Sequence, residues 1–175
     1  EQIRENTQAK TQPDEITQKE RFNNFVTGDS NILAYEYALN VARMPGKTKA
    51  NPLFIHGKSG LGKTHLLRAI KNEIHETIPE YRVEYTDIMD LVSELSTASI
   101  ERDFNRQSYK EFDKKYRSAD VLLIDDLQQI SFGKKNETIN NVFSFINSLL
   151  SQGKQVVLAA DRAPASIDLD QRYTS

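Results

Sequence analysis

Eight consecutive residues in the first half of the chain have the residue types and the spacing of a phosphate-binding loop. They are Gly57-Lys58-Ser59-Gly60-Leu61-Gly62-Lys63-Thr64 and match G-x-x-x-x-G-K-[ST] at every position. Glycines let the backbone wrap closely around phosphates, and loop N–H groups at a helix N-terminus supply partial positive charge. We expect Lys63 to reach the β- and γ-phosphates of a nucleotide and the Thr64 hydroxyl to ligate Mg²⁺. The alternative is a glycine-rich turn that precedes a helix.

Acidic residues follow two apolar runs further along the chain. Asp125 and Asp126 come directly after Val121-Leu122-Leu123-Ile124, and Asp161-Arg162 follows residues 155–160. We assign Asp125 to Mg²⁺, directly or through water, and Asp126 to orienting or deprotonating an attacking water. Asp126 is shorter than a glutamate would be, so we expect slow hydrolysis. Asp161 is a candidate sensor of the γ-phosphate. The alternative is that these acids only end strands and that Asp161 and Arg162 form a surface ion pair.

The order of predicted elements would bring these residues together. Apolar or alternating runs predict strands at 51–56, 82–86, 121–124 and 155–160. Helical spacing predicts helices at about 33–41, 64–77, 87–96, 100–117 and 139–150. Strands that alternate with helices indicate an α/β fold with a parallel sheet. In such sheets ligands bind beyond the carboxyl ends of the strands, where the phosphate loop, Asp125 and Asp161 all fall.

Composition narrows the class of protein. The chain has 175 residues, a formal net charge of −2, 38% hydrophobic and 27% charged residues, which suits one soluble domain. Residues 1–20 are polar and are interpreted as a linker or tail. The absence of cysteine excludes disulfides, thiolate zinc sites and a cysteine nucleophile, and is compatible with a cytosolic protein. No apolar run reaches the length of a membrane span.

Other residues carry weaker signals. His56, His65 and His75 have no metal-ligand partners at useful spacing and are interpreted as packing or surface residues. Lys134 and Lys135 could meet a nucleic-acid backbone or could belong to a solvated loop. The near-neutral net charge means that any nucleic-acid contact would be a local patch.

Four segments, in their order along the chain, resemble the AAA+ domain of bacterial DnaA replication initiators. They are residues 21–31, residues 51–55 running into Gly60-Leu61-Gly62-Lys63-Thr64-His65-Leu66, residues 116–128 with Ile124-Asp125-Asp126-Leu127-Gln128, and residues 161–164. The phosphate loop alone is shared by many NTPases, whereas the ordered set is far more specific. The resemblance implies a P-loop NTPase core at 21–175, built as a three-layer sandwich.

The resemblance also implies a function. It implies a cytoplasmic protein that binds ATP or ADP with Mg²⁺ and hydrolyses ATP slowly, as a weak ATPase that acts as a switch. The ATP form would assemble into a helical filament and bind single-stranded DNA to open a replication origin. The region at about 87–117 would be the initiator-specific helical insertion, and Asp161 would be the sensor. By the same match, the adenine side is lined by Phe25, Val26, Ser30 and Asn31, the phosphates lie against Gly57 and the run from Ser59 to His65, and single-stranded DNA meets Lys134 and Lys135.

The resemblance also implies which parts of the domain lie outside this sequence, and other functions remain as alternatives. It implies that the sequence stops before the arginine finger, the last strand, the helical lid and a helix-turn-helix domain that reads double-stranded origin DNA, so we expect self-assembly to be impaired. A helicase loader or a regulatory DnaA relative would share the same core. A metabolic phosphotransferase is a third alternative, but no second substrate-binding set of residues is evident.

Overall fold

Four parallel strands form a sheet at the centre of the structure, a computed structural model that describes residues 20–101, 106–131 and 136–167. The strands are β1 (Leu53–His56), β2 (Val83–Asp87), β3 (Val121–Asp125) and β4 (Gln155–Ala160). Their order across the sheet is β1-β4-β3-β2, and each neighbouring pair is parallel. All four carboxyl ends therefore lie along one edge.

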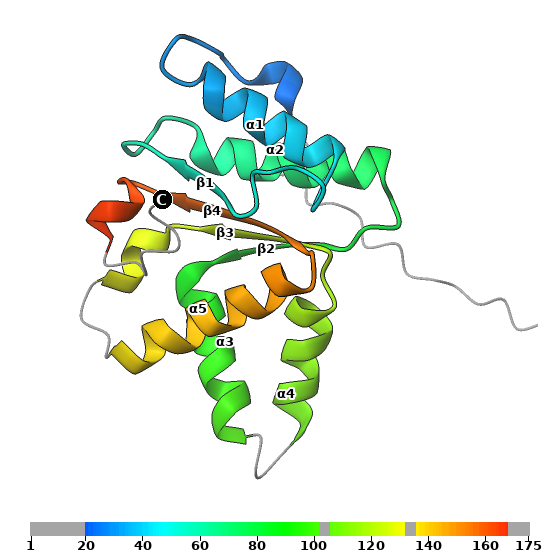
Figure 1. Cartoon of the computed structure of the whole chain (residues 1–175), viewed down its shortest axis with the longest axis vertical. Coiled ribbons are helices and arrows are strands. Elements are labelled where there is room, and N and C mark those ends of the chain that lie inside the picture. The colour runs from blue at the N-terminus through cyan, green and yellow to red at the C-terminus, as the bar shows by residue number, and fades with distance from the viewer. Residues whose placement is uncertain (1–19, 102–105, 132–135, 168–175) are drawn as a thin grey trace, which may run out of the picture.

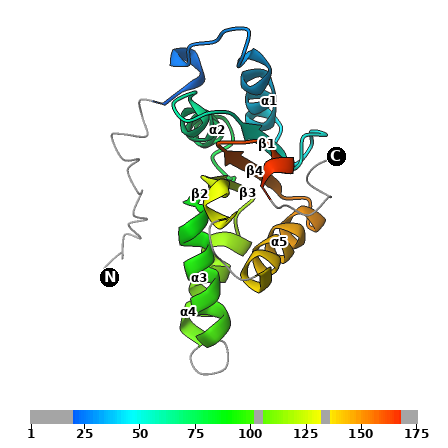
Figure 2. The same cartoon turned by 90° about the vertical axis from the view of Figure 1, so that its left-hand side faces the viewer.

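Helices cover both faces of this sheet (Figure 1). On one face lie α1 (Ile32–Arg43) and α2 (Lys63–Thr77), and on the other lie α3 (Ile88–Glu101) and α5 (Asn136–Ser151). Helix α4 (Arg106–Phe112) packs beside α3, and the pair projects away from the sheet (Figure 2). A π-helical turn at Asp113–Arg117 leads from α4 into β3. Short 3₁₀ turns lie at Phe22–Asn24, Leu127–Ser131 and Pro164–Ser166. None of the helices in the described parts of the chain is both long enough and apolar enough to cross a membrane.

The alternation of side chains along β3 explains its uninterrupted apolar sequence. Val121 and Leu123 join the cluster under α1 and α2, whereas Leu122 and Ile124 join the cluster under α3 and α5. All four side chains are buried. A strand covered on both faces has no solvent side, so the four positions that precede Asp125 are all apolar. Burying a side chain of this size contributes about 1.5–3 kcal/mol, so these four residues add strongly to the stability of both core clusters.

The predicted α/β architecture is confirmed, with differences in the region of the helical insertion. Helix α3 continues to Glu101, five residues beyond the predicted end at 96. Its serine and threonine hydroxyls bond back to carbonyls one turn earlier, as Ser96 does to Val92 and Ser99 to Leu95, so they do not end the helix. The second predicted helix, 100–117, is also wrong in detail, because Ile100 and Glu101 belong to α3 and Asp113–Arg117 is a π-helical turn.

Candidate functional site

The phosphate loop connects the end of β1 to the first turn of α2. Gly60 and Gly62 have φ angles of +82° and +83°, in the left-handed region that glycine adopts at low cost. A second reason requires glycine at position 62, because a Cβ atom there would lie 2.7 Å from Cε2 of Phe25. The loop is also tied to the sheet, since the Gly57 N–H donates to the Ala160 carbonyl at 3.2 Å. Gly62 therefore provides both the turn and the room for an aromatic ring against the loop.

The Lys63 side chain folds over the phosphate loop. Its ammonium donates to the carbonyl of Gly57 at 2.7 Å and to that of Lys58 at 3.1 Å. The positive charge is thus already held at the loop whose N–H groups would cradle phosphates. The exposed side chain of Ser59 and the half-exposed one of Leu61 stand at the rim.

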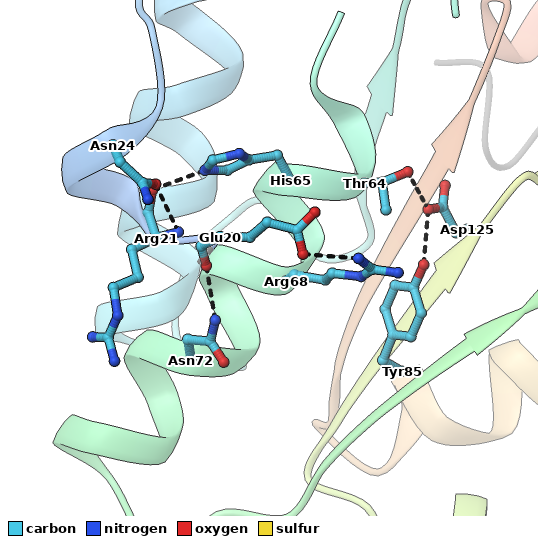
Figure 3. Close-up of polar contacts among 9 residues, drawn as sticks. All are labelled: Glu20, Arg21, Asn24, Thr64, His65, Arg68, Asn72, Tyr85 and Asp125. Carbon is cyan, nitrogen blue, oxygen red and sulfur yellow. Dashed lines mark hydrogen bonds and ion pairs between the residues drawn. The ribbon is translucent and has the colours of Figure 1, made fainter. Parts of the chain in front are cut away.

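Thr64 and Asp125 meet although 61 residues separate them in the sequence. The Thr64 hydroxyl donates to Oδ2 of Asp125 at 2.7 Å, and the Tyr85 hydroxyl donates to the same oxygen at 3.0 Å (Figure 3). The other carboxylate oxygen, Oδ1, accepts the N–H of Asp126 at 2.9 Å. Asp125 is only 4% exposed, and both of its carboxylate oxygens accept hydrogen bonds. These bonds offset the cost of burying the carboxylate.

This pair of oxygen ligands fits Mg²⁺. In phosphate-binding sites, Mg²⁺ takes one or two protein oxygens and completes its shell with phosphates and water. Within residues 20–101, 106–131 and 136–167, no three histidine, cysteine or carboxylate side chains gather as a metal-binding group. Thr64 and Asp125 therefore suit an ion shared with a bound phosphate chain.

Acidic residues gather at the carboxyl ends of β2 and β3, where Asp87 pairs in register with Asp125. Burial raises the pKa of Asp87, and the charges of Asp126, Asp90 and Asp125 raise it further. Burial likewise raises the pKa of Tyr85, and the neighbouring charge of Asp125 adds to that effect. Tyr85 is therefore a hydrogen-bond donor throughout the physiological range. A divalent cation at this edge would offset the repulsion among the carboxylates.

Asp126 and Asp161 are joined by a side chain that the sequence analysis did not assign. The Gln128 amide donates to Oδ1 of Asp126 at 2.9 Å, and its carbonyl accepts the N–H of Asp161 at 3.0 Å. Asp126 itself has a φ of +54°, a left-handed conformation that aspartate tolerates better than most residues. Through these two bonds, Gln128 connects the residue after β3 to the residue after β4.

The Asp161 carboxylate is paired with its neighbour Arg162. Oδ1 and Oδ2 accept bonds from Nε and Nη2 of Arg162 at 2.6 and 3.0 Å. These bonds hold the pKa of Asp161 below its usual value, and the charges of Arg162 and Lys63 act in the same direction. The positive charge of Lys63 therefore acts on the Asp161 carboxylate at this edge of the sheet. The surface ion pair considered from sequence is present, and the sensing role stays a prediction.

An aromatic wall stands beside the phosphate loop on the side of α1. Phe25 stacks on Tyr35 with ring centroids 5.9 Å apart and meets the edge of His65 at 5.2 Å. Val26 is 85% exposed at the tip of the adjoining loop. The Asn31 side chain closes that loop by donating to the Val26 carbonyl and accepting the Gly28 N–H. Asn31 stands at the start of α1, but its side chain does not cap the helix, because it turns back into the loop.

His65 has a structural partner in the segment that leads into the core. Its Nε2 lies 2.9 Å from the Arg21 carbonyl, a bond that requires Nε2 to carry the proton. The ring therefore joins α2 to that segment and supports Phe25, in agreement with the packing role expected from sequence. Its assignment to the cofactor stays a prediction.

The structure brings most of the candidate residues to one edge, and it adds others. The phosphate loop, Asp125, Asp126 and Asp161 share the carboxyl edge of the sheet, with the Phe25 wall alongside. Lys134 and Lys135 lie outside the described residues. Tyr85, Arg68 and Gln128 were missed as site residues. For Tyr85, the sequence predicted only a strand at 82–86, which does not indicate a contact with Asp125.

Comparison with known proteins gives consistent matches. The family description "bacterial DnaA ATPase domain" matches residues 16–175. The chain is 42% identical over 153 residues to the chromosomal replication initiator protein DnaA of Methylobacillus flagellatus, covering 87% of this chain and 31% of that protein. It thus spans about a third of the length of the curated relatives it matches.

Solved structures match in the same way. Domain III of the Thermotoga maritima replication initiation protein DnaA superposes with a TM-score of 0.76 at 37% identity, covering 89% of this chain and 62% of that one. A replication initiator DnaA bound to AMPPCP and single-stranded DNA superposes with a TM-score of 0.74 at 35% identity, covering 88% of this chain and 46% of that one. Both agree with the three-layer α/β architecture.

Proposed function

The chain belongs to the bacterial DnaA ATPase domain family, and from that premise we propose that it is the ATP-binding core of a replication initiator, acting in the cytoplasm, whose nucleotide state controls self-assembly and single-stranded DNA binding. The observation that carries the proposal is the 2.7 Å hydrogen bond between Thr64 and Asp125. It joins the phosphate loop to the end of the central strand, where a magnesium nucleotide binds in P-loop proteins.

Each group at this edge has a part in the proposed nucleotide site. Lys63 and the loop N–H groups would neutralise and orient the phosphates, and the base would lie against Phe25, Val26 and Asn31. When bound through Thr64 and Asp125, Mg²⁺ would supply positive charge to the phosphate oxygens. Asp126 would orient water, and Asp161 would sense the γ-phosphate.

Slow hydrolysis follows from the surroundings of Asp126. Its Oδ1 already accepts a hydrogen bond from Gln128, so one of the two carboxylate oxygens is engaged before it could orient a water. Its side chain is also shorter than a glutamate. A slow ATPase keeps the ATP form long enough for assembly, which suits a switch better than a catalyst with rapid turnover.

The proposed DNA contact is electrostatic. The relative described above holds AMPPCP and single-stranded DNA together. With a net charge of −2, this chain would bind a strand through a local patch, for which Lys134 and Lys135 are the proposed residues. Binding through backbone phosphates would be largely independent of base sequence.

Fluorescence anisotropy of a labelled single-stranded oligonucleotide tests this function. The oligonucleotide is titrated with the full chain, first in the presence of ATP and then in the presence of ADP. The double variant Lys134→Ala/Lys135→Ala is compared with Lys47→Ala/Lys49→Ala, which removes the same amount of charge elsewhere in the chain. We expect binding that requires ATP and that weakens in the first double variant alone. Equal or absent binding with both nucleotides would instead favour a regulatory relative of the family.

A further inference from the structure

Tyr85 projects from β2 toward the face of the sheet that α2 covers, and its hydroxyl reaches the candidate magnesium ligand. The hydroxyl oxygen lies 3.0 Å from Oδ2 of Asp125. The ring is half-buried and packs against the cluster under α1 and α2. The hydroxyl of a half-buried tyrosine needs a hydrogen-bond partner, and here that partner is the carboxylate oxygen that also accepts the Thr64 hydroxyl.

The hydrogen bonds of Asp125 show what Tyr85 contributes. Oδ1 accepts the N–H of Asp126, whereas Oδ2 accepts both the Thr64 and the Tyr85 hydroxyls. Thr64 is itself a candidate metal ligand, so its hydroxyl oxygen would be engaged by a bound metal. The Asp126 N–H and the Tyr85 hydroxyl act on one oxygen each and do not depend on the metal. Together they fix the rotation of the carboxylate, a torsion that is otherwise broad.

Tyr85 is in turn held by a stripe of residues on α2 (Figure 3). The Arg68 guanidinium lies 5.5 Å from the centroid of the Tyr85 ring, within the range of a cation–π contact. Arg68 is four residues after Thr64, and Asn72 is four residues after Arg68, so the three share one helix face.

The stripe is anchored by Glu20, the first residue that the structure describes. Its carboxylate accepts a bond from Nη1 of Arg68 at 2.8 Å, and its backbone carbonyl accepts one from Nδ2 of Asn72 at 2.7 Å. The Arg21 carbonyl next to it is bonded to His65. A continuous set of contacts therefore runs from Glu20 through Arg68 and Tyr85 to Asp125.

We propose that Tyr85 is a positioning residue for the magnesium-binding carboxylate of Asp125 and that Arg68, fixed by Glu20, holds the Tyr85 ring in place. The inference rests on the proposed magnesium-nucleotide function. Groups that orient a metal ligand without touching the metal set its affinity, and their removal typically weakens metal binding about 10–100-fold. Tyr85 acts through the Asp125 carboxylate, so we expect nucleotide affinity without the metal not to depend on it.

A magnesium titration separates these effects. Binding of a fluorescent ATP analogue to the full chain is measured in EDTA and at increasing Mg²⁺, for the natural chain and for Tyr85→Phe. We expect the Mg²⁺ concentration at half-effect to rise roughly tenfold in the variant, with the affinity in EDTA unchanged. Arg68→Met should raise it by a smaller factor, roughly threefold, because it loosens the ring but keeps the hydroxyl.

Tyr116→Phe is the matched control. The Tyr116 hydroxyl bonds Glu94 at 3.1 Å and Thr86 at 3.2 Å, on the opposite face of the sheet. It loses the same bonded phenol hydroxyl without touching Asp125, so its Mg²⁺ requirement should equal that of the natural chain.

Several outcomes would overturn the proposal. One is a Tyr85→Phe variant with the natural Mg²⁺ requirement, and another is an equal loss of affinity with and without Mg²⁺, which would indicate a structural role. A Tyr116→Phe shift of the same size would do so as well. If Tyr85→Phe does not fold, an unchanged Mg²⁺ requirement in Arg68→Met overturns it. Absence of any Mg²⁺ effect in the natural chain would instead remove the proposed function itself.

Discussion

Replacing Gly62 with alanine should destabilise the chain more than the same change at Gly60, because only Gly62 lies against an aromatic ring. The two glycines have nearly identical φ angles, +83° and +82°. A Cβ atom at Gly62 would lie 2.7 Å from Cε2 and 3.3 Å from Cζ of Phe25, whereas one at Gly60 meets nothing within 4 Å. Gly60→Ala is therefore a control for the backbone effect.

The size of the difference follows from the contact. A non-glycine residue in the left-handed region costs about 1–2 kcal/mol, and both variants lose that much. Overpacking costs a further ~1–3 kcal/mol, which only Gly62→Ala incurs, through displacement of Phe25. At about 2–4 °C per kcal/mol for a domain of this size, Gly60→Ala should lower Tm by about 2–8 °C, and Gly62→Ala by about 2–12 °C more.

Thermal and urea unfolding without nucleotide measure this effect separately from binding. In a Phe25→Ala background the ring is absent, so Gly62→Ala should cost no more than Gly60→Ala. The two substitutions are then non-additive, as expected for residues in contact. Equal destabilisation by the two glycine variants in the natural background, or a penalty at Gly62 that persists without Phe25, would refute the reasoning.

Three further predictions concern charge. Lys63→Ala should abolish ATP binding and leave Tm unchanged, and an undiminished affinity in a binding titration would show that the loop is not the phosphate site. Asp125→Asn should remove the ability of Mg²⁺ to strengthen nucleotide binding, and a persisting Mg²⁺ effect would contradict the metal assignment. Burial raises the pKa of Glu84 above its ordinary value of 4.5, against the charges of Lys115 and Lys71. The folded state then binds the proton of Glu84 more tightly than the unfolded state does, so the free energy of unfolding should fall as pH rises from about 4.5. In urea unfolding, Glu84→Gln should make this dependence of stability on pH less steep. An unchanged dependence would mean that other groups cause it.

Local sequence patterns predicted the fold because each layer imposes its own periodicity. The apolar run at Val121–Ile124 predicted a strand buried on both faces, and β3 lies between two helical layers. Helix ends were less accurate. Helix α3 runs to Glu101, beyond the predicted end at 96, and the hydroxyls of Ser96, Thr97 and Ser99 bond to carbonyls within the helix.

The candidate site divides along the same line. The phosphate loop and Asp125 were found from sequence because their chemistry depends on adjacent residues and on the end of a strand. Gln128 was seen only as part of a motif, since its bond to Asp161 spans 33 residues. Arg68 gave no signal, because a basic residue on a helix face is usually solvated.

The sequence by itself determined the phosphate loop, the alternation of strands and helices, and the family to which the chain belongs. These properties depend on residue type and short spacing, and short spacing is translated directly into backbone geometry. Only the tertiary structure decided which side chains complete the site. Tyr85 bonds Asp125 because parallel pairing in register sets β2 beside β3, and Arg68 meets Tyr85 because α2 packs across that pair. Contacts between elements depend on packing in three dimensions, which no single segment of the sequence contains.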